Sequence, residues 1–221
     1  MNKESGNIII YIIAAIFLIG LLTLLVRGSS TPGGGIDREA LILKASEVRS
    51  YAAELERGVQ FVLQNGASET QISLAHPNHS STYGTYGTTP EFEVFHPNGG
   101  GAEWRDNDSS IQTFDLDWTF TSGNAVDGVG TTCAANACAD LIAILYDLTE
   151  DFCNVINDQI GAFDIPPPQT QTLFASNLFN GTYTYSYTIG DAGDVIEGHT
   201  EGCYQNSGGS SYGYYKVLLA R

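Results

Sequence analysis

The strongest hydrophobic pattern in the chain is an uninterrupted apolar run over residues 8–26, close to the N-terminus. The run carries no charge, and only Tyr11 and Thr23 have polar side-chain atoms. Because a helix rises about 1.5 Å per residue, a helix of this length approaches the ~30 Å hydrocarbon core of a bilayer. We expect residues 1–27 to form a hydrophobic membrane or filament-core helix. The alternative is a cleaved secretory signal, which usually has a shorter apolar run and a more basic start than Lys3 alone.

The next two segments predict a linker and a soluble helix. In residues 28–35, Pro32 is followed by three glycines, a composition that disfavours a helix and indicates a flexible linker or hinge. Over residues 36–65, apolar residues recur at every third or fourth position, which is the spacing of one helical face. This stripe comprises Leu41, Ala45, Val48, Ala52, Leu55, Val59 and Val62. We expect this helix to pack on a sheet.

Shorter patterns predict that sheet and a second helix. Alternating apolar and polar residues predict strands over residues 71–74, 91–95, 112–120, 182–189 and 213–219. The strongest of them is expected to place four apolar residues on one face: Phe114, Leu116, Trp118 and Phe120. Apolar residues at helical spacing predict the second helix over residues 140–160. The expected fold of residues 36–221 is an α+β domain with helices packed on an antiparallel sheet.

Charge excludes one class of partner. The chain has a formal net charge of −16, from 25 acidic and 9 basic residues. Most of the basic residues precede residue 58, so the body of the domain is acidic. Such a surface repels phosphate backbones, and we therefore expect no direct binding of nucleic acid.

The four cysteines, Cys133, Cys138, Cys153 and Cys203, all follow the apolar run. An even number of cysteines in a chain with an export signal indicates two disulfide bonds in an oxidising compartment. Four cysteines allow three pairings. We favour a local Cys133–Cys138 bond together with a Cys153–Cys203 bond that joins a helix to the C-terminal sheet. These disulfides also indicate that the domain lies outside the cytoplasm.

No motif in the sequence indicates an enzyme. The chain lacks a Gly-x-Ser-x-Gly elbow, a phosphate-binding loop and a His-Glu-x-x-His zinc motif. His76 and His79 could place two metal ligands on one loop, although a polar turn explains their spacing as well. We expect no catalytic residue and no bound cofactor.

Two acidic clusters contain the hard oxygen ligands that calcium prefers. One cluster is formed by residues 106–108. The other is formed by Asp191, Asp194 and Glu197 in a glycine-rich loop, and is the better candidate. Neither has the spacing of an EF-hand, and solvated loops are the alternative explanation. N-glycosylation triplets begin at Asn78, Asn107 and Asn180, but such triplets are common by chance.

The order of elements resembles the type IV pilin and pseudopilin class. That class has an N-terminal apolar helix, then an amphipathic helix, an antiparallel sheet and a late disulfide. Three stretches look like those of bacterial pilin-like proteins: residues 4–7, residues 95–101, and residues 201–203 together with 214–219. The resemblance implies assembly through Ile8, Tyr11, Ala14, Ala15 and Gly20.

The resemblance also implies processing by a prepilin peptidase, with Gly6 as the candidate site. The chain departs from the family pattern at two places. The position of the family's conserved glutamate falls on Tyr11, and Pro32 with the following glycines interrupts the helix.

These observations lead to two hypotheses of function. The first is a structural subunit of an extracellular pilus-like filament or secretion pseudopilus, which self-associates through its N-terminal helix. Its expected partners are membrane lipid before assembly and the assembly machinery of the pilus or secretion system. The second is a monomeric, membrane-anchored binding domain at the periplasm, the cell surface or a virion membrane. The expected location is an inner membrane with an extracytoplasmic domain, or a filament on the cell surface.

Overall fold

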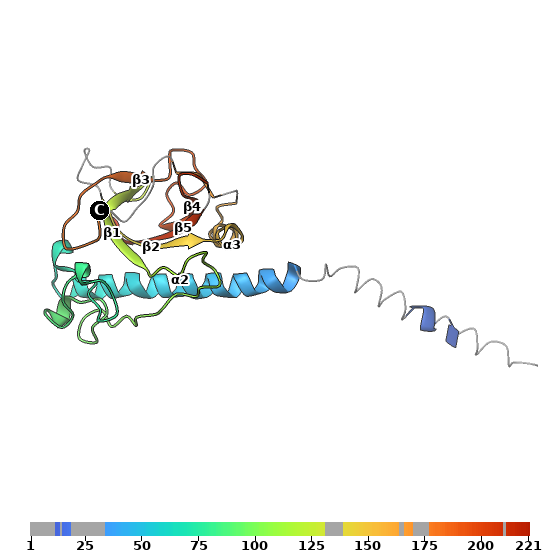
Figure 1. The fold of residues 1–221 in the computed structure, drawn as a ribbon, viewed down its shortest axis with the longest axis horizontal. Coiled ribbons are helices and arrows are strands. Elements are labelled where there is room, and N and C mark those ends of the chain that lie inside the picture. The colour runs from blue at the N-terminus through green and yellow to red at the C-terminus, as the bar shows by residue number, and fades with distance from the viewer. Residues whose placement is uncertain are drawn as a thin grey trace, which may run out of the picture. The chain divides into compact units, whose positions relative to one another are not determined.

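The computed structural model describes residues 12–13, 15–18, 34–130, 139–163, 166–169, 177–209 and 211–221 (Figure 1). By internal contacts the chain divides into two units, Met1–Ala40 and Leu41–Arg221. The second unit holds an α+β domain in which helices pack on a sheet that is mostly antiparallel. The boundaries expected at residues 27 and 35 remain a prediction.

The helix predicted over residues 36–65 is confirmed as α2, Gly34–Gln64. It begins at Gly34, so two glycines that were expected in the linker are helical. The predicted apolar stripe is its buried face, where five side chains are fully inaccessible to solvent: Ala45, Ala52, Leu55, Val59 and Val62. From Leu41 onward α2 runs along one face of the sheet (Figure 1).

A close backbone contact at Gly100 holds the loop that follows α2 against this helix. A Cβ atom at Gly100 would lie only 2.8 Å from the carbonyl oxygen of Gly58 and 2.6 Å from that of Val94. Glycine is therefore required where this loop crosses α2, because any side chain would push the two backbones apart.

The sheet has five strands in the order β3-β1-β2-β5-β4. Their bounds are β1 Thr119–Val126, β2 Asp140–Leu148, β3 Tyr187–Ile189, β4 Glu201–Gln205 and β5 Tyr212–Leu219. Neighbouring strands are antiparallel except for the edge pair β1 and β3, which is parallel. The strand expected over residues 213–219 is confirmed as β5.

The helix predicted over residues 140–160 is wrong in its first half. Asp140–Leu148 is the central strand β2, and the helix α3 covers Glu150–Ile160. Leu141, Ala143 and Leu145 face the α2 side of the sheet, whereas Ile142 and Ile144 face the other side. A strand buried on both faces reads as a continuous apolar run, and such a run also satisfies helical spacing.

The sheet therefore separates two apolar clusters. The larger cluster lies between the sheet, α2 and α3 and includes Trp118, Phe120, Phe152 and Tyr214. The smaller cluster lies on the opposite face and is covered by loops that contribute Ala162 and Ile196. Tyr204 and Tyr215 belong to this second cluster and are fully buried.

The strand predicted over residues 112–120 is also displaced. β1 begins at Thr119, and the preceding residues form a loop in which the side chains of Phe114 and Leu116 are 66% and 39% exposed. Trp118 and Phe120 are buried as predicted. Before β1, the segment still contacts the end of β2 through a bridge from Gln112 to Leu148 and a hydrogen bond from the backbone N of Thr113 to the carbonyl oxygen of Asp147.

The other predicted strands are shorter than expected. Of residues 182–189, only Tyr187–Ile189 forms a strand, β3. Residues 71–74 and 91–95 meet in one parallel bridge between Ser73 and Glu93. Short 3₁₀ helices precede each of these positions, at Glu69–Gln71 and Pro90–Phe92, and a third lies at Ser81–Tyr83.

Within the described residues, no helix combines the length and the apolar character that crossing a membrane requires. The apolar run over residues 8–26 lies largely outside the described part of the chain. The membrane or stalk helix is therefore still a prediction.

Candidate functional site

The described residues of the N-terminal run form helical turns with exposed apolar side chains. Five large side chains are 54–71% exposed: Ile12, Ile13, Ile16, Phe17 and Leu18. Of the residues expected to mediate assembly, Ala15 belongs to this helical stretch and is exposed. Gly6, Ile8, Tyr11, Ala14 and Gly20 lie outside the described residues. Exposed apolar surface of this kind is stabilised when lipid or protein covers it.

The outer face of α2 also carries apolar side chains. Leu43 is 66% exposed, Phe61 is 49% exposed and Ile42 is 39% exposed. They share this face with polar residues such as Ser46 and Gln60. A helix whose inner face is fully buried normally has a polar outer face, so these three residues indicate a surface that another molecule can cover.

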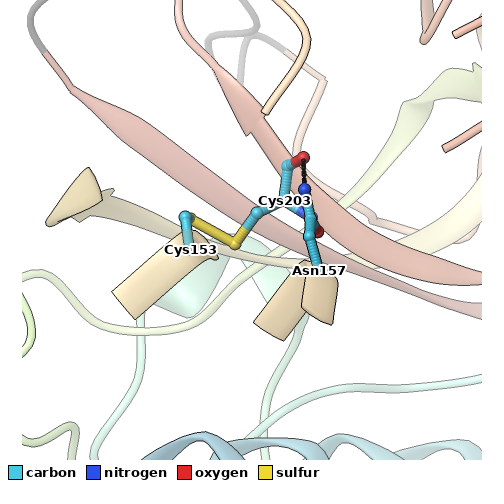
Figure 2. The surroundings of a disulfide bond; sticks show 3 residues. All are labelled: Cys153, Asn157 and Cys203. Carbon is cyan, nitrogen blue, oxygen red and sulfur yellow. Dashed lines mark hydrogen bonds between the residues drawn. A yellow bond between two sulfur atoms is a disulfide. The ribbon is translucent and has the colours of Figure 1, made fainter. Parts of the chain in front are cut away.

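A disulfide joins Cys153 in α3 to Cys203 in β4, as the sequence analysis favoured (Figure 2). The two Cα atoms are 5.4 Å apart, and both residues are fully buried. Asn157, one turn along α3, accepts a hydrogen bond from the backbone N of Cys203 at 2.8 Å and donates one to its carbonyl oxygen at 3.1 Å. The helix is thus attached to the strand by both a covalent bond and a paired hydrogen bond. The expected Cys133–Cys138 bond lies outside the described residues.

A half-buried ion pair connects α2 to the far edge of the sheet. Nε and Nη2 of Arg49 donate to Oε1 of Glu201 at 3.2 and 2.7 Å, and the hydroxyl of Tyr214 donates to its Oε2 at 2.8 Å. Nη1 of Arg49 also reaches Gln159 of α3 at 3.1 Å. Burial raises the pKa of Glu201, but the hydrogen bonds from Arg49 and Tyr214 outweigh it and hold the pKa below its ordinary value.

Histidines and aromatic rings gather in the loop between α2 and β1. This histidine–aromatic cluster consists of His76, His79, Tyr83, Tyr86, Phe95, His96 and Trp104. The ring of His76 stacks on Trp104 with centroids 4.9 Å apart, and that of His79 stacks on Tyr83 at 4.4 Å. Tyr86 lies between His76 and His96.

Hydrogen bonds in this cluster require neutral histidines. Nδ1 of His76 accepts the backbone N–H of Asn78 at 3.2 Å, and Nδ1 of His96 accepts that of Asn98 at 3.1 Å. Both turns have the sequence His-Pro-Asn, a repeated signal that the sequence analysis overlooked. With Nδ1 as the acceptor, the proton of each neutral ring is on Nε2, so Nε2 has no lone pair for a metal. One of the two histidines in the two-ligand interpretation, His76, is therefore committed to its own turn.

Acid should destabilise the domain through this cluster. Burial lowers the pKa of His76 and of His79, against the opposing charges of Asp106 and Asp117 respectively. In addition, the buried Nε2 of His79 has no partner among the described residues. A histidine pKa that is depressed by folding gives stability that is complete above the unfolded value of about 6.5 and is lost as the pH falls through the folded value. We expect the melting temperature to decrease from pH 7.5 to pH 5.

The measurement is thermal unfolding by circular dichroism over this pH range. The double variant His76→Gln/His79→Phe should flatten most of the decrease between pH 7 and 5, because neither replacement titrates there. His199→Asn is the matched control and should keep the wild-type slope. An unchanged slope in the double variant would show that other groups cause the acid sensitivity.

In both candidate calcium sites, carboxylates form hydrogen bonds or an ion pair with other groups of the chain. In the better one, Oδ2 of Asp194 accepts the backbone N–H of Asp191, and Oε2 of Glu197 accepts that of Gly193. In residues 106–108, Asp106 accepts the indole N–H of Trp104, and Asp108 is paired with Lys44 at 2.8 Å. Among the described residues, no group of three or more His, Cys, Asp or Glu side chains is arranged to hold a metal ion.

The asparagines of the three glycosylation triplets differ in their exposure and hydrogen bonding. Nδ2 of Asn107 donates to the carbonyl oxygen of Leu116, which commits that side chain to the loop. Asn78 and Asn180 are exposed. Thr182 donates to Oδ1 of Asn180 at 2.5 Å, so the third triplet has a hydrogen-bonded turn.

Comparison of the chain with protein-family models, curated proteins and solved structures found no match.

Proposed function

We propose that the chain is a structural subunit of an extracellular pilus-like filament or secretion pseudopilus. The observation that carries this proposal is the exposed apolar surface of the N-terminal helical turns, residues 12–13 and 15–18. Burial of apolar surface contributes about 25 cal/mol per Å², so a continuous apolar helix strongly favours a lipid or protein environment. In the proposal, the helix lies in the membrane before assembly and in the filament core afterwards.

The described domain supports the proposal in three further ways. First, an amphipathic helix precedes a mostly antiparallel sheet that a late disulfide joins to α3. The outer face of α2 adds Ile42, Leu43 and Phe61 as a surface for neighbouring subunits. The Cys153–Cys203 bond suits an oxidising compartment outside the cytoplasm.

The acidic body suits the outer surface of such an assembly. With a formal net charge of −16, apolar helices must supply the attraction between subunits while the charged domains face water. Assembly of this kind needs no catalytic residue.

A charge placed on the outer face of α2 tests the proposal. Leu43→Glu should abolish filaments or reduce them at least tenfold, because the 66% exposed side chain becomes buried between subunits. The domain should stay folded, with an unchanged melting temperature. The measurement is negative-stain electron microscopy of material sheared from cells, with N-terminal sequencing of the same sample.

Phe163→Glu is the matched control. Phe163 is 73% exposed and follows Ala162, which packs on the sheet face opposite α2. This variant should form normal filaments. A mature N-terminus at Asn7 would support processing after Gly6. Wild-type protein that stays in the membrane fraction without filaments would contradict the proposal and favour the monomeric anchored domain.

A further inference from the structure

A polar cavity lies where three separate segments meet on the domain. Its volume is about 270 Å³. The 3₁₀ turn at Ser81–Tyr83 contributes Thr82, β1 contributes Ser122, and the segment after residue 176 contributes the remaining lining residues: Asn177, Leu178, Asn180, Thr182 and Thr184. The sequence analysis named Asn180 only as the start of a glycosylation triplet and did not find this site, because its three segments are distant from one another in the chain.

Hydrogen bonds between these segments hold the walls in place. The backbone N of Ser122 donates to the carbonyl oxygen of Asn177 at 3.3 Å, and its carbonyl oxygen accepts from the backbone N of Thr184 at 3.1 Å. The hydroxyl of Ser122 donates to the carbonyl oxygen of Thr182 at 2.6 Å. The cavity is therefore formed before a ligand arrives, which reduces the entropy lost on binding.

Its lining is neutral and hydroxyl-rich. Six of the seven described lining residues carry a hydroxyl or a carboxamide, and none carries a charge. This is unusual on a chain with a formal net charge of −16, because acidic side chains cover much of its remaining surface. A neutral, hydroxyl-rich lining offers a charged ligand no opposite charge, whereas it offers the hydroxyl groups of a neutral ligand both donors and acceptors.

Several of these polar groups are available to a ligand. Nδ2 of Asn180 and the hydroxyl of Thr184 make no hydrogen bond to another described residue. The hydroxyl of Thr82 accepts from Ser80 at 2.9 Å, and its own proton can still be donated. Leu178 supplies an apolar patch on the same wall. This combination provides donors and acceptors for hydroxyl groups together with a surface for C–H groups.

We propose that this cavity binds one neutral sugar ring of a glycan. A pyranose has alternating hydroxyl and C–H surfaces, which match the polar groups and Leu178. The cavity is just below the ~300–1,000 Å³ range of drug-sized ligand sites, so one ring fits it better than an extended oligosaccharide. A single ring makes few contacts, so it should bind with a dissociation constant in the roughly millimolar range.

Saturation-transfer difference NMR of the full-length protein in lipid nanodiscs tests the proposal. Nanodiscs avoid detergents with sugar headgroups. The probes are glucose, galactose, mannose and N-acetylglucosamine, with N-acetylneuraminic acid as the charged comparison. At least one neutral sugar should show saturation transfer that a titration places in the millimolar range, and the charged sugar should bind at least tenfold more weakly.

Two variants locate the binding in the cavity. Thr184→Val and Thr82→Val keep the side-chain shape but remove a hydroxyl, and each should weaken binding about tenfold. Thr85→Val is the matched control, because Thr85 is an exposed threonine of the same loop that does not line the cavity. Its affinity should equal that of the wild type.

Three results would overturn the proposal. They are saturation transfer from none of the four neutral sugars, equal affinity in the two cavity variants and the wild type, and stronger binding of the charged sugar. None of them depends on filament formation, so this test and that of the assembly surface fail independently.

Discussion

Replacing Cys153 and Cys203 together with alanine should lower the free energy of unfolding by about 4 kcal/mol. The bond closes a loop with a sequence separation of 50 residues, and the entropy of an unfolded chain that is no longer closed by this bond gives that magnitude. The loop contains most of α3 and all of β3, so the release of the bond frees both of these elements in the unfolded chain. The measurement is denaturant unfolding followed by far-ultraviolet circular dichroism.

Single variants separate the disulfide from the packing of its sulfur atoms. Cys153→Ala and Cys203→Ala should each lose nearly the full amount, because either change removes the bond. A further change of Asn157 to alanine in the double variant should destabilise α3 again, since that side chain pairs with both backbone groups of residue 203. A loss below about 1 kcal/mol in the double variant would mean that α3 and β4 associate equally well without the bond.

Replacing Arg49 with methionine should lower the free energy of unfolding by about 3 kcal/mol. Methionine keeps much of the aliphatic stem but leaves Glu201 with an 18% exposed side chain and without its charged partner. Breaking a largely buried ion pair on one side costs about 3–5 kcal/mol, because the remaining charge is poorly solvated. The partial exposure of this pair places the effect at the lower end.

The pH dependence of this variant has a definite sign. In the wild type, the depressed pKa of Glu201 gives stability that is present above its ordinary value of 4.5 and is lost as the pH falls through the folded value. Without Arg49, the pKa of Glu201 should be higher than in the wild type, because burial is then opposed only by Tyr214 and Lys216. The difference in stability between wild type and variant should therefore be largest near pH 7 and shrink toward pH 3.

Arg105→Met is the matched control for Arg49→Met. Arg105 pairs with Glu54 at 2.5 Å, but the side chains of this pair are 46% and 24% exposed. Exposed pairs contribute about 0–1 kcal/mol, so this variant should lose no more than about 1 kcal/mol. Equal losses in the two variants would show that the burial of the Arg49–Glu201 pair has no special effect.

The local sequence pattern predicts an amphipathic helix well, because one of its faces is buried and the other is exposed to water. The stripe from Leu41 to Val62 predicted α2 almost to its ends, because the 3.6-residue period is visible without knowledge of the partner. The last strand, β5, was also predicted, although both of its faces are buried. The Cys153–Cys203 pairing was favoured from the expected elements, and the structure contains it.

The local sequence pattern gave wrong predictions where the burial of a residue depends on partners that are distant in sequence. β2 was taken for a helix because both of its faces are covered, which removes the alternation that distinguishes a strand. Phe114 and Leu116 lie on the predicted apolar face but are exposed, because they belong to a loop between the Gln112–Leu148 bridge and the start of β1 at Thr119. In both cases the tertiary contacts decided the conformation against the local signal.

The features that bear on function also fall into those set by local sequence and those set by tertiary contacts. The sequence by itself determined the uncharged apolar run over residues 8–26, the acidic character of the domain, the amphipathic helix and the presence of four cysteines. Each of these follows from residue type and local spacing. The tertiary structure decided the ion pair between Arg49 and Glu201, the stacking of His76 on Trp104, and the neutral cavity around Ser122. These depend on which distant segments the folded backbone brings within hydrogen-bonding and van der Waals distance, and no local pattern encodes that choice.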